Sequence, residues 1–210
     1  MKKLIALIGA VALICSMAFP ALANGSINEL KAEIVSLEIV VDNLSETVKA
    51  ELAKPDVQVV ATNIAEPDNS WTSEVVKDLV SDFNDPNTTL SMETVVEELK
   101  TLAVNEGNSK DLETLKNADF ASGFAEVSLV KDGKKSYSVN GEDVPTKQTL
   151  KYEQLKGLSA EQLIGFQIFL MNPETGKFVL ITLNPENFDP LTGEITVDFP
   201  FLGTYALVQI

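Results

Sequence analysis

The longest regular hydrophobic pattern in the chain lies between residues 27 and 53. Its apolar residues recur at alternating spacings of three and four positions: Ile27, Leu30, Ile34, Leu37, Val41, Leu44 and Val48. This heptad spacing predicts one long helix, with Ser26 and Glu29 as a capping box at its start and Pro55 after its end. Two alternatives follow: a coiled-coil homodimer through this seam, or a helix that docks on its own domain, because further β-branched residues widen the apolar face.

The next 60 residues mix one strand pattern with helical patterns. Residues 57–61 alternate as a short strand, and residues 73–83 and 91–104 each carry an apolar stripe at helical spacing. Ser91 is a candidate N-cap, residues 105–109 form a polar loop, and residues 112–115 predict a further helical turn.

After about residue 120 the period changes to two. Strands are predicted over residues 124–130, 136–139, 150–155, 164–171, 177–183, 194–199 and 204–210. The Asp132-Gly133 and Asn140-Gly141 pairs are hairpin signals. Short strands at this turn spacing are typical of an antiparallel sandwich. The expected fold is therefore α+β, with a heptad helix (24–55), a mainly helical region (56–117) and a β-sandwich domain (118–210).

The first 23 residues have the three parts of a secretory signal peptide. Lys2 and Lys3 precede an unbroken apolar run over residues 4–14, and Ala21 to Ala23 form a small-x-small cleavage site. We expect cleavage after Ala23 and a secreted, extracellular protein without membrane insertion. Cys15 lies inside this segment after Ile14, and a lipoprotein signal would place a small residue there.

Composition excludes several classes of function. The first 23 residues hold two of the 16 lysines and none of the 31 acidic residues, so the chain from Asn24 onward carries a formal charge of −17. Such a surface repels phosphate backbones and anionic membranes. From Asn24 onward the chain has no Cys, His or Arg. Disulfides, His-containing triads and zinc sites built on His or Cys are therefore excluded.

The C-terminal strands resemble a known type of module. The segments Gly176-Lys177-Phe178, Gly193 to Val197 and Tyr205 to Val208 are similar to the last strands of Ig-like sandwiches in uncharacterised secreted or surface proteins of Gram-positive bacteria. The resemblance covers residues 163–210. It implies an Ig-like fold and a location outside the cell, and it carries no active site.

The remaining candidate chemistry rests on oxygen-rich loops. Asp82, Asn84, Asp85 and Asn87 lie within six residues, and a similar run spans residues 184–189. Clustered carboxylate and amide oxygens suit Ca²⁺, but neither run has the EF-hand register, and the same residues are ordinary turn formers. We therefore predict no obligatory cofactor, with calcium at the first loop as the alternative to a simple turn.

No residue set predicts catalysis. Ser128 and Lys131 match a Ser-x-x-Lys pattern only in letters, within a predicted strand, and no pair of acids stands out for glycoside hydrolysis. Trp71, the single Trp, is predicted to cover the core rather than to bind sugar. The expected function is thus a non-catalytic interaction or surface-associated protein with a protein or cell-surface partner. The alternatives are a secreted enzyme, or enzyme accessory, that acts on glycans through carboxylates, and a self-assembling structural protein.

Overall fold

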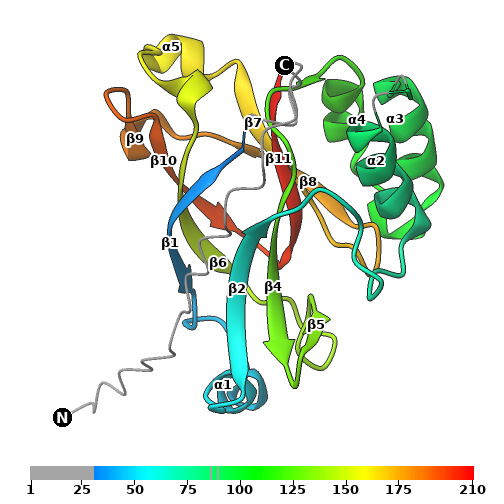
Figure 1. Ribbon diagram of the computed structural model, residues 1–210, viewed down its shortest axis with the longest axis vertical. Coiled ribbons are helices and arrows are strands. Elements are labelled where there is room, and N and C mark those ends of the chain that lie inside the picture. The colour runs from blue at the N-terminus through cyan, green and yellow to red at the C-terminus, as the bar shows by residue number, and fades with distance from the viewer. Residues whose placement is uncertain (1–30, 86, 89) are drawn as a thin grey trace.

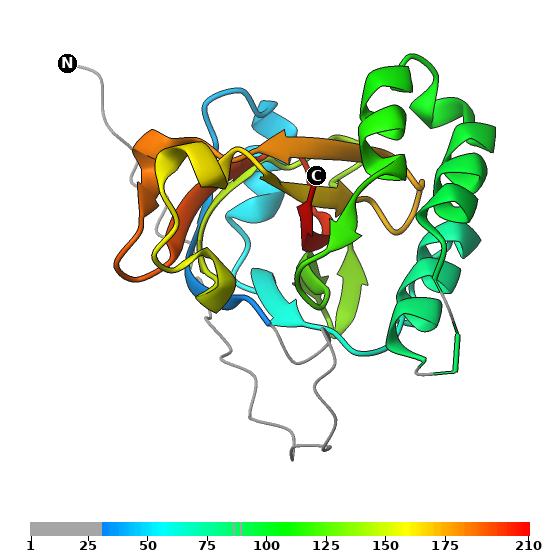
Figure 2. The same ribbon diagram turned by 90° about the horizontal axis from the view of Figure 1, so that it is seen from above.

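The structure, a computed structural model, describes residues 31–85, 87–88 and 90–210, and it has three layers. A four-stranded sheet (sheet A) packs on a seven-stranded sheet (sheet B), and helices cover the other side of sheet B (Figures 1 and 2). Every strand pairing in both sheets is antiparallel. The fold is therefore α+β with a sandwich-like arrangement of sheets, as the change of period predicts.

Sheet A has the order β1-β6-β10-β9, with β1 Glu33–Ile39, β6 Thr146–Lys151, β10 Glu194–Phe199 and β9 Phe188–Asp189. Sheet B has the order β2-β4-β11-β7-β8, with β2 Val57–Asn63, β4 Ala125–Lys131, β11 Gly203–Gln209, β7 Phe166–Met171 and β8 Phe178–Thr182. Two short strands complete sheet B: β3 (Asp119–Phe120) pairs with β11, and β5 (Lys134–Ser136) pairs with β4.

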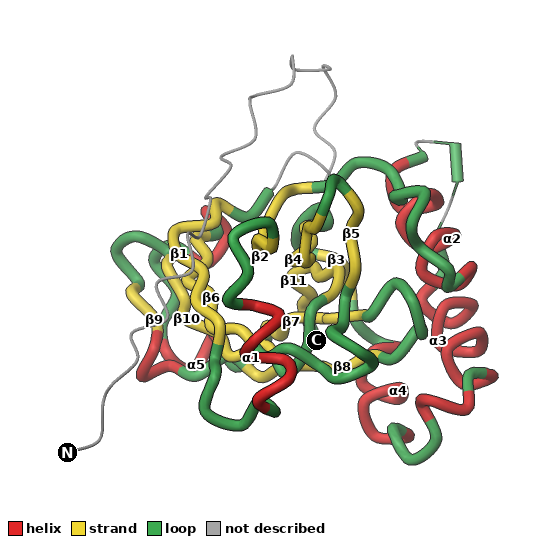
Figure 3. Tube along the Cα trace, turned by 90° about the horizontal axis from the view of Figure 1, so that it is seen from below, coloured by secondary structure: helices red, strands yellow, loops and turns green. Residues whose placement is uncertain are grey.

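Three helices form the layer on sheet B: α2 (Glu74–Asn84), α3 (Met92–Thr101) and α4 (Ser109–Lys116). Figure 3 shows them together at one side of the strands. The smaller helices α1 (Glu46–Leu52) and α5 (Ala160–Leu163) lie outside this layer. The predicted helices over 73–83 and 91–104 are confirmed, although the second ends at Thr101 and a 3₁₀ turn, Ala103–Asn105, follows. The Ser91 side chain accepts a hydrogen bond from the Thr94 N–H, as its predicted N-cap role requires.

The core has two compartments because sheet B is covered on both faces. Between the sheets, the rings of Phe199 and Tyr205 lie 4.9 Å apart, and the Tyr205 hydroxyl donates to Gln148 Oε1 (3.1 Å). On the helical side, ring contacts of 4.9–6.3 Å link Phe83, Phe120, Phe124, Phe169 and Phe178. Because both faces of sheet B are covered, β7 and β11 contain unbroken apolar runs. Strands with one solvent-exposed face instead alternate between apolar and polar residues.

The prediction of one continuous helix over residues 27–53 is wrong: in the described part of this segment, only Glu46–Leu52 is helical. The segment contains strand β1, a turn and the short helix α1. Ile34 pairs with Leu150 and Ser36 with Thr149, so Val35 is an extra residue, a β-bulge. The bulge places Ile34 and Leu37 on the same face of the strand despite their spacing of three, which imitates a helical period.

Two other parts of the heptad prediction have separate outcomes. Leu44 and Val48 are buried on the inner side of α1 and its entry, four residues apart, so the helical spacing there is real but local. Ile27, Leu30, the Ser26 capping box and the signal peptide lie outside the described residues. Leu37, Leu44 and Val48 are buried within the fold, so the predicted residues do not form an exposed helical seam, and a homodimer stays a prediction.

The expected division at residue 118 also needs correction. β1 pairs with β6 and β2 pairs with β4, so both sheets combine strands from before and after this point. The carbonyl groups of Pro173, Glu174 and Gly176 in the β7–β8 turn accept hydrogen bonds from the segments around α2 and α3, which joins the helical layer to the strands. Within the described ranges, no helix is both long and apolar enough to cross a membrane.

Candidate functional site

The most unusual group in the core is Glu126, whose exposed fraction is 1%. It lies in β4, flanked by β2 on one side and β11 on the other, and its backbone neighbours are Thr62 and Thr204. A carboxylate that is removed from water needs partners of opposite charge or hydrogen-bond donors. Four residues supply or extend these contacts, and with Glu126 they form what we call the Glu126 cluster: Asp68, Trp71, Glu126, Lys135 and Tyr137.

The cluster is a chain of polar contacts from the core to the surface. The Trp71 indole Nε1 donates to the Tyr137 hydroxyl (2.6 Å), and this hydroxyl donates to Glu126 Oε2 (2.9 Å). The Lys135 ammonium binds Glu126 Oε1 and lies 3.2 Å from Asp68 Oδ2. Trp71 is 1% exposed and Tyr137 is fully buried, so the cluster opens to solvent only at Lys135 and Asp68.

A tight hairpin places two members of the cluster beside Glu126. Asp132 and Gly133 have positive φ angles of 50° and 72°, as a type I′ turn requires, and they join β4 to β5. Lys135 therefore pairs with Val130, which is four residues from Glu126 on the same face of β4. Tyr137 follows two residues later on that face. The predicted Asp-Gly hairpin signal is thus confirmed and positions the cluster.

The segment before α2 supplies the other two members, and the β7–β8 turn holds it in place. The backbone N–H groups of Thr72 and Ser73 both donate to the Pro173 carbonyl (3.2 and 2.8 Å). Glu174 in the same turn accepts a hydrogen bond from the Tyr137 N–H (3.3 Å). The predicted role of Trp71 as a cover over the core is confirmed by its burial.

The electrostatics of the cluster favour a charged lysine and a neutral tyrosine. Burial raises the pKa of Tyr137 far above its ordinary value, and the negative charge of Glu126 acts in the same direction. Burial alone would lower the pKa of Lys135, but its contacts with Glu126 and Asp68 outweigh burial and raise it. The Ser70 N–H donates to Asp68 Oδ1 (2.9 Å), and this hydrogen bond holds the pKa of Asp68 below its ordinary value. The partial burial of Asp68 acts in the opposite direction, but the Ser70 hydroxyl and Lys135 lower the pKa further.

These contacts give the Glu126 cluster the character of an internal clamp. One carboxylate oxygen of Glu126 is bound by Lys135 and the other by Tyr137, and Trp71 covers the tyrosine. Sequence reasoning missed Glu126 and Lys135. The available signal was the single acid in strand β4, since a buried acid requires a partner.

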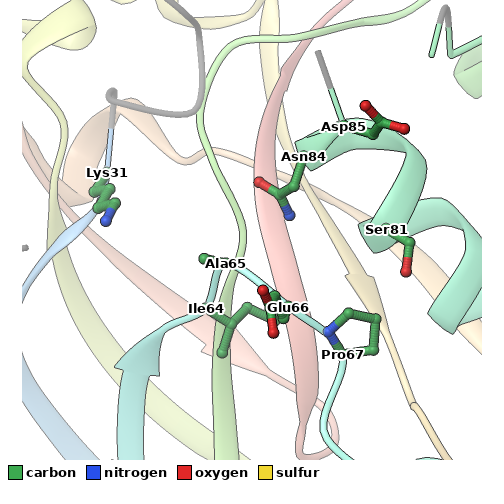
Figure 4. A pocket seen from close by; sticks show the side chains of 8 residues that line it. All are labelled: Lys31, Ile64, Ala65, Glu66, Pro67, Ser81, Asn84 and Asp85. Atoms are coloured by element: carbon green, nitrogen blue, oxygen red, sulfur yellow. The ribbon is translucent and has the colours of Figure 1, made fainter. Parts of the chain in front are cut away.

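A surface depression lies beside the cluster, in the segment that follows β2. It has a volume of about 640 Å³ and is lined by Lys31, Ile64, Ala65, Glu66, Pro67, Ser81, Asn84 and Asp85. Figure 4 shows Lys31 on one side, the last turn of α2 on the other, and residues 64–67 between them. Glu66 and Asp85 are the two acids among its lining residues. Hydrogen bonds from Asn87 and Thr88 hold the pKa of Asp85 below its ordinary value, whereas a general acid needs a raised pKa.

Of the four residues of the proposed calcium loop, Asp82 and Asn84 lie in the last turn of α2, and Asp85 and Asn87 follow it. Asp85 accepts hydrogen bonds from the Asn87 N–H (2.8 Å), the Asn87 side-chain amide (3.0 Å) and the Thr88 hydroxyl (3.1 Å). The Asn84 amide donates back to the Val80 carbonyl (2.7 Å), and Asp82 is exposed. In the described part of the chain, no three His, Cys, Asp or Glu residues are placed to hold a metal ion. Calcium binding here stays a prediction without support from these contacts.

The strand geometry also separates Ser128 from Lys131. Residues three apart in a regular strand point to opposite faces, and the Lys131 ammonium binds Glu51 Oε1 (2.6 Å) on another element. Ser128 is buried. These two residues therefore do not form a Ser-Lys dyad.

Comparison with known proteins adds no further residue or family to this picture. No family model, no curated protein and no solved structure matches the chain.

Proposed function

We propose that the chain is a secreted, non-catalytic interaction module that binds a protein or cell-surface partner. The single observation that carries this proposal is the closed Glu126 cluster. Its buried acid has both oxygens engaged by residues of the fold, so this acid serves the structure. The signal-peptide pattern supports the location, and the formal charge of −17 from Asn24 onward supports a partner that is not anionic.

The proposal includes an Ig-like sandwich as the binding scaffold. The resemblance of residues 163–210 to surface modules supports it, together with the passage of the chain from β10 in sheet A directly to β11 in sheet B. The three helices on sheet B are an addition to such a scaffold.

The glycan-acting alternative has one candidate place, the depression that contains Glu66 and Asp85. The lowered pKa of Asp85 and the Asn87 contacts weigh against a role as general acid. We therefore rank the interaction function first.

One pair of assays separates the two functions. Residues 24–210, labelled with a fluorophore, are incubated with the producing cells at physiological salt, and the purified protein is assayed for release of reducing sugar from isolated cell-wall glycan. We expect saturable binding and no sugar release. Sugar release that disappears in the double variant Glu66→Gln/Asp85→Asn would overturn the proposal, and so would the absence of saturable binding.

A further inference from the structure

Strand β8 is an open edge of sheet B. Figure 2 shows it along the outer margin of the sheet, on the side of β7 away from β11. At its first residue, the outward backbone groups are satisfied: the Phe178 N–H donates to Asn105 Oδ1 and the Phe178 carbonyl accepts from the Asn108 amide, both at 3.3 Å. In an antiparallel ladder every second residue points its backbone groups outward. Leu180 and Thr182 therefore present theirs to the edge, where the described residues provide no partner.

The other sheet edges carry the protection that natural edge strands usually have. β1 has a bulge at Val35 and two acids, Glu33 and Glu38, and β9 is two residues long. β5 carries Lys134 and Lys135. β2 lies next to the start of β1, where the Asn63 side chain donates to the Ala32 carbonyl (3.0 Å). Charges, bulges, short length and cover all prevent unwanted pairing.

Beyond Phe178, β8 has none of these protections. Its five residues are Phe, Val, Leu, Ile and Thr, without charge, proline or bulge, and its three central side chains are half-buried. Strands of this composition pair readily with another extended chain. An unprotected edge in a protein that protects its other edges indicates that this edge has a partner.

The charge of the chain selects the class of partner. A second copy would bring together two chains that each carry about −17, and their repulsion opposes self-pairing at β8. An extended segment with lysine or arginine is instead attracted to this surface. Main-chain hydrogen bonds to the edge would provide affinity, and alternate side chains would contact the half-buried residues.

We propose that β8 receives an extended, basic segment of a partner protein as an additional strand, bonded to the backbone groups of Leu180 and Thr182. This inference rests on the proposed function, since it names the partner class and the binding edge of the same module. It requires no movement of sheet B, because the outward groups already face away from β7.

The test uses residues 24–210 and a synthetic nine-residue peptide that alternates β-branched residues with lysine (KVTVKVTVK). Amide signals in NMR spectra report the binding site, and amide hydrogen exchange reports new hydrogen bonds. We expect the Leu180 and Thr182 amide signals to shift and their exchange to slow about tenfold or more, which corresponds to about 1.4 kcal/mol. The acidic analogue EVTVEVTVE is the peptide control.

Two variants at one position separate backbone pairing from apolar contact. Leu180→Pro removes the outward N–H and keeps the β7–β8 ladder, because edge strands tolerate proline at such positions; Leu180→Ala removes only the side chain. We expect Leu180→Pro to weaken peptide binding about tenfold and Leu180→Ala less than about threefold. The unaltered chain is measured as well, so the exchange result stands even if the proline variant does not fold.

Four outcomes would overturn the inference: no binding at 1 mM peptide, signal changes spread over the acidic surface, equal binding by Leu180→Pro, or a doubled mass in light scattering without peptide. Cell binding by Leu180→Pro distinguishes this failure from failure of the proposed function. If the variant folds and binds cells as well as the unaltered chain does, the module function stands and the β8 edge is not its site.

Discussion

Removal of the Lys135 charge is the sharpest test of the Glu126 cluster. Lys135→Met keeps the apolar stem of the side chain and leaves the buried Glu126 carboxylate with Tyr137 as its remaining partner. Breaking a buried ion pair from one side typically costs 3–5 kcal/mol. Because the Lys135 side chain is 29% exposed, water can partly replace its charge, and we expect a loss of about 3 kcal/mol in the free energy of unfolding.

The opposite substitution should cost less. Glu126→Gln removes the charge and still accepts the Tyr137 hydroxyl, while Lys135 keeps Asp68 as a partner at 3.2 Å. We expect a loss of about 1–2 kcal/mol, and a similar loss for the double variant, since neither leaves an unpaired buried ion. The two substitutions should therefore be non-additive by about 2 kcal/mol or more.

Urea unfolding followed by tryptophan fluorescence measures these values, because the single Trp71 belongs to the cluster. Lys100→Met is the matched control: its partner Glu97 is an exposed residue three positions away, and we expect a change within about 0.5 kcal/mol. Additive losses, or a Lys135→Met cost no larger than that of the control, would refute the argument that Glu126 depends on Lys135.

Three further outcomes are expected. All three tyrosines are buried, and their pKa values are raised above the ordinary 10.0, so the stability that they contribute is complete below pH 10 and falls as the pH rises beyond it. Absorbance at 295 nm should show no tyrosinate while the protein is folded. A titration step near pH 10 before unfolding would contradict the burial of the tyrosines. Gly203→Ala would place a Cβ 2.1 Å from the Met171 carbonyl oxygen, and we expect the free energy of unfolding in urea to fall by about 3 kcal/mol or more. An unchanged urea midpoint would contradict this expectation. Leu37→Ala should cost about 2–4 kcal/mol and Val35→Ala less than about 1, because Leu37 is buried and Val35 is 40% exposed; equal costs would argue against the bulge.

Local sequence signals predicted much of the fold. Helices α2 and α3 each bury a stripe of apolar residues at helical spacing: Val76, Leu79 and Val80 in α2, and Val95, Val96 and Leu99 in α3. Packing on sheet B keeps these segments helical, as their spacing predicts. Asp132 and Gly133 predicted their hairpin because few other residue pairs adopt two positive φ angles. These features depend on residues that are neighbours in the chain.

Features that depend on distant residues could not be predicted in the same way. The bulge at Val35 exists because β1 pairs with β6, more than a hundred residues later, and without that partner the spacing from Ile34 to Leu37 suggests a helix. Likewise, Asp68 and Trp71 come from the segment after β2, and only the packing of that segment on sheet B brings them to the hairpin that holds Glu126 and Lys135. The candidate site was therefore beyond local pattern, although a lone acid in strand β4 marked one end of it.

The position of β11 in the middle of sheet B has a consequence for the order of folding. Residues 203–209 lie between β4 and β7, and they also hold β3. A nascent chain that stops before Gly203 lacks the strand that joins the two halves of this sheet, so its earlier strands have no complete core to condense on. We expect such a chain to stay loosely packed until these residues are made. For the secreted protein that we propose, a loosely packed chain is the form that passes through a translocation channel, so the position of β11 would favour folding after export.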